Sequence, residues 1–78
     1  MTPERIKALR QALGRTQAEF ASDLGLKLRA LVYWEAGTPD RGPTGPALIL
    51  LYMLERHPRR LKEVQQIAAE IAAEKETK

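Results

Sequence analysis

The chain contains no cysteine, and this absence excludes disulfide bonds, thiolate metal sites and cysteine nucleophiles. It has a single histidine, His57, which stands beside Pro58 at the expected end of a helix. No nucleophile stands with a base, no glycine loop is placed to cradle a phosphate, and no metal-ligand spacing occurs. We therefore expect neither an enzyme nor a cofactor, and we interpret His57 as a capping or surface residue.

Long hydrophobic runs are also missing. No apolar stretch is long enough to span a bilayer, and the charged residues among positions 1–7 leave no apolar core for a signal peptide. Together with the absence of cysteine, this predicts a soluble, cytoplasmic protein with no membrane partner. At 78 residues we expect one small domain, residues 1–78, in which helix packing or dimerisation supplements a small core.

The net charge of +3 is modest but unevenly distributed. Residues 1–62 carry 11 Lys and Arg against 6 Asp and Glu, whereas residues 63–78 carry 2 against 4. A basic body favours an anionic polymer, because neutralising phosphates releases their counterions. Such a charge is common among soluble proteins, so it does not by itself identify a nucleic-acid-binding protein.

Helical periodicity predicts an all-α protein of five helices. Ile6, Leu9 and Leu13 form the apolar stripe of the first helix. The fourth is almost wholly apolar, which is typical of a central core helix or a subunit interface. Residues 37–45 contain three glycines and two prolines and are expected to form a loop. The expected helices span residues 3–13, 16–24, 27–36, 46–56 and 58–75.

Residues 16–37 predict two short helices joined by a tight turn. Thr16 and Glu19 have the spacing of a capping box, which starts a helix, and Gly25 provides the left-handed residue that ends it. Leu31 and Trp34 then recur at helical spacing on the inner face of the next helix. Two helices joined in this way cross at a wide angle, as in a helix-turn-helix.

This segment resembles the phage-repressor/Cro-type (XRE) helix-turn-helix family. The resemblance implies a five-helix, lambda-repressor-like domain with its helix-turn-helix at residues 16–36. It also implies a regulator of transcription that binds double-stranded DNA. The matching residues are Thr16, Gln17, Phe20, Ala21, Leu24, Gly25, Leu26, Leu31, Trp34, Glu35 and Gly37.

In a helix-turn-helix the second helix enters the major groove, so its outward residues are expected to read bases. Arg29 suits a bidentate contact to guanine, and Leu28 and Val32 suit thymine methyl groups. An alternative is that Leu28 and Val32 pack inward if the helix is rotated. The complete base-reading set is Lys27, Leu28, Arg29, Val32 and Tyr33.

Phosphate contacts are expected from Arg15, Thr16, Gln17 and Arg41, and the resemblance implies this role most directly for Gln17. Arg15 and Arg41 are equally compatible with solvated surface charges. Lys27 departs from the family, which usually has Ser or Thr as the helix cap and phosphate ligand there, so a longer cation replaces a cap.

The resemblance also implies a structural ion pair. Arg10 and Glu35 occupy positions that form a partly buried ion pair in the family, and this pair orients the first helix on the reading helix. One reading helix buries too little surface for tight specific binding, so we expect a homodimer on an inverted repeat with half-sites about 34 Å apart. Two dimer surfaces stay open, the end of the helix containing residues 48–54 and a stripe on the last helix. The stripe comprises Leu61, Val64, Ala68 and Ile71.

The segments Pro43–Leu48 and Leu54–Pro58 also resemble the region after the motif in XRE-type antitoxins. That similarity implies self-repression of an operon, with a toxin as partner held outside the reading helix. A rival interpretation is a protein-interaction module that keeps the fold without binding DNA. The apolar Leu28 and Val32 and the modest charge support it.

Overall fold

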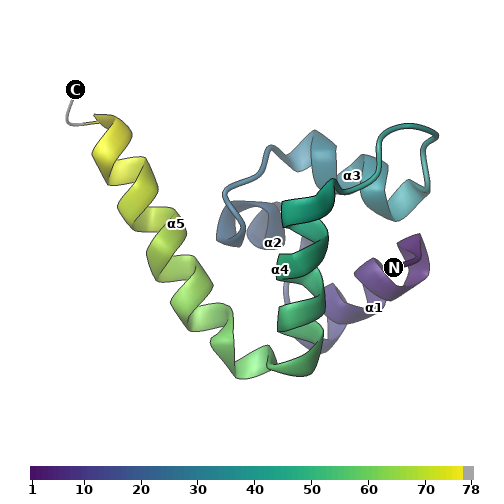
Figure 1. Ribbon diagram of the computed structural model, residues 1–78, viewed down its shortest axis with the longest axis horizontal. Coiled ribbons are helices and arrows are strands. Elements are labelled where there is room, and N and C mark those ends of the chain that lie inside the picture. The colour runs from purple at the N-terminus through teal and green to yellow at the C-terminus, as the bar shows by residue number, and fades with distance from the viewer. Residues whose placement is uncertain (77–78) are drawn as a thin grey trace.

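The structure, a computed structural model, describes residues 1–76, which fold into five α-helices and one short 3-10 helix, with no strand in that range. This confirms the expected all-α, five-helix class. Figure 1 shows α1, α2 and α3 gathered around α4, while α5 stands to one side. The bounds are α1 Pro3–Ala12, α2 Gln17–Asp23, α3 Leu28–Ala36, α4 Gly45–Arg56, the 3-10 helix η1 Pro58–Arg60, and α5 Leu61–Glu76.

Each of the first three helices is shorter than expected, because terminal residues that we assigned to the helix are its caps. Leu13 and Leu24 are the C-caps of α1 and α2, and Thr16 and Lys27 are the N-caps of α2 and α3. The sequence pattern includes the cap residues in the helix because they adjoin the periodic positions. Their backbone, however, is only partly in the helical hydrogen-bonding pattern.

The expected start of the last helix is wrong. Residues 58–60 form a 3-10 helix, in which the amide of Arg60 donates to the carbonyl of His57 at 3.0 Å, and the α-helix begins at Leu61. Pro58 has no amide to donate and cannot continue α4, so the chain tightens there before α5 starts. Helix α4 also begins one residue early, at Gly45 instead of Pro46.

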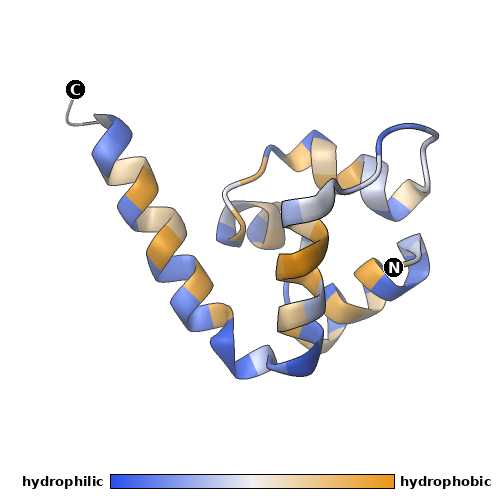
Figure 2. Ribbon diagram, in the orientation of Figure 1, coloured by the Kyte–Doolittle hydropathy of each residue, from blue (hydrophilic) through white to orange (hydrophobic). Residues whose placement is uncertain are grey.

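The core lies where α4 meets the first three helices. Leu51 and Leu54 of α4 are fully buried, and so is Phe20 of α2. Ile6 of α1 is only 1% exposed. Figure 2 shows the apolar part of α4 at the centre of the molecule. The buried hydrophobic residues are Ile6, Leu9, Phe20, Ala21, Leu31, Trp34, Leu51 and Leu54.

Helix α5 packs on the body only through its first half, up to Ala68. Leu61 and Val64 pack against the core, and Gln65 Nε2 donates to Asp23 Oδ1 of α2 at 3.0 Å. The following residues up to Lys75 are exposed except for the half-buried Ala68. Half of the predicted dimer stripe is thus used within the chain. No helix within residues 1–76 is long and apolar enough to cross a membrane.

Gly37 ends α3 in the left-handed conformation, with a φ of 71°. The end of α3 also approaches the start of α1 here, because a Cβ on Gly37 would lie 3.2 Å from Cγ of Pro3. A side chain would therefore meet both a strained backbone and a close neighbour.

We expect Gly37→Ala to lower the free energy of unfolding by about 1–2 kcal/mol, the cost of a non-glycine residue in this conformation. Thermal unfolding followed by circular dichroism measures it. Gly42→Ala is the matched control, since Gly42 has no positive φ and open space where its Cβ would stand. Equal melting temperatures for the two variants would contradict the expectation.

Candidate nucleic-acid interface

A complete capping box starts α2. The Thr16 hydroxyl oxygen accepts from the Glu19 amide at 3.1 Å, and the Glu19 carboxylate accepts from the Thr16 amide at 3.0 Å. These two bonds satisfy amides that a helix start otherwise leaves unpaired. The first residue of the helix, Gln17, is thereby held at a fixed position on the surface.

Gly25 makes the turn between α2 and α3. Its φ is 70°, and the amide of Leu26 donates back to the carbonyl of Ala21 at 2.8 Å. This bond closes the end of α2 and sends the chain directly into α3. The relative direction of the two helices is therefore set by a single left-handed residue.

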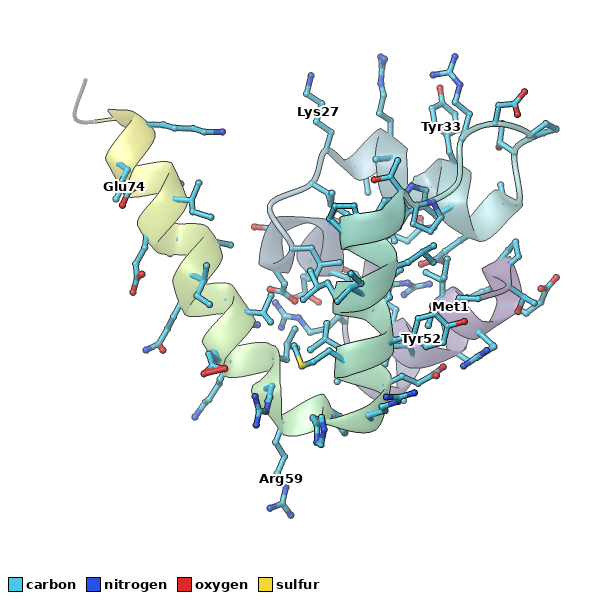
Figure 3. The ribbon with its side chains drawn as sticks, viewed as in Figure 1. Met1, Lys27, Tyr33, Tyr52, Arg59 and Glu74 are labelled. Atoms are coloured by element: carbon cyan, nitrogen blue, oxygen red, sulfur yellow. The ribbon has the colours of Figure 1, made fainter. Side chains whose placement is uncertain are left out.

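Helix α3 has one buried and one open face. Leu31 is fully buried and Trp34 is 8% exposed, whereas Leu28 is 47% exposed and Val32 38% exposed. The alternative in which Leu28 and Val32 pack inward therefore does not hold. Lys27 and Arg29 are also exposed, and Tyr33 is half-buried. In Figure 3 the labelled Lys27 and Tyr33 project from the same edge of the molecule.

Arg41 lies over this edge from the loop after α3. Its guanidinium carbon stands 5.6 Å from the centre of the Tyr33 ring, a cation–π arrangement. The structure thus brings a predicted phosphate ligand next to a predicted base-reading residue.

Arg10 and Glu35 form a two-bonded ion pair between α1 and α3. The distances are 2.7 Å from Nε and 3.0 Å from Nη2 of Arg10 to the two carboxylate oxygens of Glu35. Arg10 also donates to the carbonyl of Arg15 at 2.8 Å, and Gln17 Nε2 donates to Glu35 at 3.2 Å. The side chains are only 12% and 5% exposed, so the pair is largely shielded from water.

The side chains expected at phosphates differ in how free they are. Arg15 makes two bonds to Asp23, of 2.9 and 3.0 Å, and Gln17 is bound to Glu35 as described. Thr16 is exposed but caps α2, and Arg41 is exposed in its loop. Of the four, Arg41 would lose the fewest contacts within the protein on binding a phosphate, because it makes no side-chain hydrogen bond within residues 1–76.

The sequence reasoning missed two residues of this region. Asp23 is 7% exposed and accepts from both Arg15 and Gln65. Its position three residues after Phe20, on the buried face of α2, is the signal that could have found it. Lys7 was also missed, and it lines a surface hollow of about 370 Å³ together with Gln17, Val32, Glu35, Arg10 and Ala36.

Hydrogen bonds and neighbouring charges shift the pKa of Arg5, Arg10, Arg15 and Glu19. Hydrogen bonds to Glu55, Glu35 and Asp23 raise the pKa of Arg5, Arg10 and Arg15 respectively, so these cations stay charged at any working pH. The pKa of Glu19 is lowered, first by the hydrogen bond from the Thr16 amide and then by the charge of Arg15. Within residues 1–76 no group of His, Asp and Glu side chains is placed to hold a metal ion.

The lowered pKa of Glu19 makes the stability of α2 depend on pH. The carboxylate binds its proton more weakly in the folded protein, so its contribution is present above the ordinary pKa of 4.5 and is lost as the pH falls through the lowered value. We expect Glu19→Gln to lose stability at neutral pH and to approach the wild type near about pH 3. Urea unfolding at both pH values tests this, and a constant gap between the proteins would refute it.

The Arg10–Glu35 pair should be a main determinant of stability. Glu35→Ala leaves a shielded guanidinium without its partner, which costs roughly 3 kcal/mol, and DNA binding falls with the folded fraction. Urea unfolding measures the loss. Glu55→Ala is the control, because it breaks the more exposed Arg5–Glu55 pair and should cost far less. A Glu35→Ala protein that melts like the wild type would show that the pair does not hold the fold.

The comparisons with known proteins agree with this geometry. The chain is 30% identical over 67 residues to "Antitoxin HigA-2" of Vibrio cholerae serotype O1 (strain ATCC 39315 / El Tor Inaba N16961). The aligned region covers 86% of this chain and 62% of that relative, so the chain spans less than two thirds of the relative's length. No solved structure matches the chain significantly. Residues 6–51, from α1 to the middle of α4, match the family described as "Helix-turn-helix", and the chain therefore belongs to the XRE-type helix-turn-helix family of DNA-binding regulators.

Proposed function

We propose that the chain is a sequence-specific repressor that inserts α3 into the major groove of double-stranded DNA. The observation that carries this proposal is the division of α3 into two faces. Leu31 and Trp34 fix the helix to the core, while Leu28 and Arg29 at its N-terminal end stay exposed. That end is the part of a reading helix that meets base edges.

Each outward side chain has a role suited to its chemistry. Arg29 donates two hydrogen bonds to a guanine, and Leu28 and Val32 contact thymine methyl groups. Lys27 and Tyr33 lie at the two ends of this set, with Lys27 at the start of α3 and Tyr33 beside Arg41. Arg29 is the largest single determinant of base preference in this assignment.

Phosphate contacts hold the helix in register without reading sequence. We assign them to Thr16, Gln17 and Arg41, and to Arg15 through the guanidinium N–H groups that Asp23 leaves unused. Gln17 opens α2, where the positive end of the helix dipole favours a phosphate.

A single reading helix buries little surface, so tight binding calls for two copies. We propose a homodimer on an inverted repeat, with half-sites about 34 Å apart. Two copies related by a two-fold axis would present two α3 helices to successive major grooves on one side of the duplex.

The first experiment is selection of binding sites from a random duplex pool, with the wild type beside Arg29→Ala at moderate salt. We expect the wild type to enrich an inverted repeat and Arg29→Ala to lose preference at one base of each half-site, with a penalty on the order of 1–3 kcal/mol. Lys62→Ala is the control, since Lys62 is exposed in α5, outside the motif. The control should enrich the wild-type site.

Failure to enrich any site would favour the rival, a protein-interaction module. The salt dependence of binding separates the two functions. A DNA complex with several phosphate contacts weakens steeply with the logarithm of the salt concentration, whereas an apolar protein interface barely responds.

A second function is favoured by the named relative, "Antitoxin HigA-2". We propose that the chain also binds a toxin through a surface outside α3 and represses the operon that encodes both. A toxin-like reading frame next to its gene would supply the partner. Co-expression should give a complex and relieve any growth arrest that the product causes alone. A product that neither binds nor is neutralised would remove this proposal.

A further inference from the structure

Outside the reading helix, the large exposed apolar side chains lie on α4 and α5. Ile49 of α4 is 74% exposed, and Ile67 and Ile71 of α5 are 50% and 49% exposed. Ile49 stands on the face of α4 opposite the buried Leu51 and Leu54. It belongs to a surface hollow of about 580 Å³, which we call the α4 hollow. Its lining comprises Gly45, Leu48, Ile49, Tyr52, Met53, Arg56 and His57.

The outer half of α5 has nothing to cover it within the chain. Every residue from Ala69 to Lys75 is exposed, which amounts to about two helical turns. Helices this short gain most of their stability from packing an apolar face, and Ile67 and Ile71 form such a face at a spacing of four residues. Figure 1 shows this part of α5 standing apart from the other helices.

The two surfaces carry opposite charge. The α4 hollow is rimmed by Arg56 and contains no acidic residue, and Arg59 and Arg60 follow it in η1. On α5 the exposed Glu63 and Glu70 lie four residues before and three residues after Ile67, on the same side of the helix, whereas the exposed Lys62 lies on another side. Within residues 1–76 neither Arg56 nor Glu63 takes part in an ion pair of the chain itself. The basic, apolar α4 hollow and the acidic, apolar face of α5 are therefore complementary, and both are present on the same molecule.

We propose that two copies of the chain dimerise by exchanging these contacts. Ile67 and Ile71 of each α5 pack into the α4 hollow of the partner copy, around Ile49. The proposal rests on the homodimer of the proposed function and names its interface.

A two-fold axis that suits DNA binding is compatible with the exchange. Lys27 and Tyr33 project from one edge of the molecule (Figure 3), and an axis along that direction leaves both α3 helices on the same side. Helices α4 and α5 run in opposite senses along this direction (Figure 1), and the axis preserves those senses. The α5 of one copy therefore runs antiparallel to the α4 of the other.

The antiparallel register brings the charges together. Ile49 and Arg56 are seven residues apart, about 10.5 Å along a helix. When Ile49 lies between the partner's Ile67 and the partner's Ile71, the partner's Glu63 lies six residues, about 9 Å, back along α5 from that point, so the flexible side chain of Arg56 can reach it. The two-fold axis makes this contact twice.

Direct pairing of α5 with its copy is the main competing arrangement. The same axis would make the two α5 helices run in the same sense and set like charges at matching positions, Glu63 near the partner's Glu63. It would also leave the α4 hollow uncovered. A stable dimer buries about 800 Å² on each partner, and the exchange reaches this area more easily because each copy contributes two surfaces.

Sedimentation velocity without DNA tests the interface. The wild type should be a dimer, and Ile49→Asp and Ile71→Asp should each be monomers at the same concentration. Both side chains are well exposed within one copy, so neither substitution disturbs the core, and circular dichroism of each variant should show the helical content of a folded chain. Leu28→Asp is the matched control, an exposed apolar residue of α3 that should remain dimeric. A dimer that tolerates Ile49→Asp would overturn the exchange.

A charge-reversal pair gives the sharper test. Arg56→Glu and Glu63→Arg should each weaken the dimer on the order of tenfold or more, because each creates two repulsive contacts. Mixing the two variants should restore wild-type affinity, since in the mixed dimer both contacts join opposite charges. Pairing of α5 with α5 predicts no effect of Arg56→Glu, and that result would overturn the proposal.

The failure of this inference is distinguishable from failure of the proposed function. A wild type that stays monomeric at high concentration overturns the exchange, while binding of that monomer to a half-site would leave sequence-specific DNA binding intact. Loss of dimerisation in Ile71→Asp with retained half-site binding supports the exchange and keeps the reading role of α3 separate.

Discussion

The ion pair between Arg10 and Glu35 fixes the part of the molecule on which the proposed reading surface of α3 depends. Arg10 holds Glu35 of α3 by two hydrogen bonds and the carbonyl of Arg15 by a third, and Gln17 of α2 joins the same carboxylate. The Arg10–Glu35 pair thus connects three helices and the loop between α1 and α2. Val32 lies one turn before Glu35 on α3. The ion pair that holds Glu35 therefore also sets the direction in which Val32 points outward.

A second polar link performs the same task for α5. Asp23 is buried at the end of α2, where an isolated carboxylate would be costly, and both Arg15 and Gln65 donate to it. Arg15 compensates the negative charge of Asp23. Gln65 donates a further hydrogen bond to the same carboxylate and so joins α5 to α2. Apolar packing of Val64 brings α5 near the body, and the hydrogen bond selects its orientation.

Local signals made the fold predictable from the sequence, and long-range contacts limited the prediction of the site. The capping box of Thr16 and Glu19 and the left-handed Gly25 act within a few residues, so their spacing specifies the two-helix unit. The bidentate bond of Arg15 to Asp23 depends on how the chain bends after α1, and no spacing rule reports it. The predicted dimer stripe mixed the core-facing Leu61 and Val64 with the exposed Ile71, because periodicity gives the faces of a helix but not the neighbour on each face.

The contact between α5 and the helix-turn-helix links the two halves of the proposed mechanism. A Cβ at Gly25 would lie 4.0 Å from Cβ of Ala68, so α5 rests against the turn that aims α3. Asp23, two residues before that turn, is bonded to Gln65, one helical turn before Ala68 on the same face of α5. A second copy that covers the outer half of α5 would hold these contacts in place, and it would reduce the freedom that α3 must lose on entering the groove. Dimerisation would then favour DNA binding by preorganising each reading helix as well as by supplying a second one.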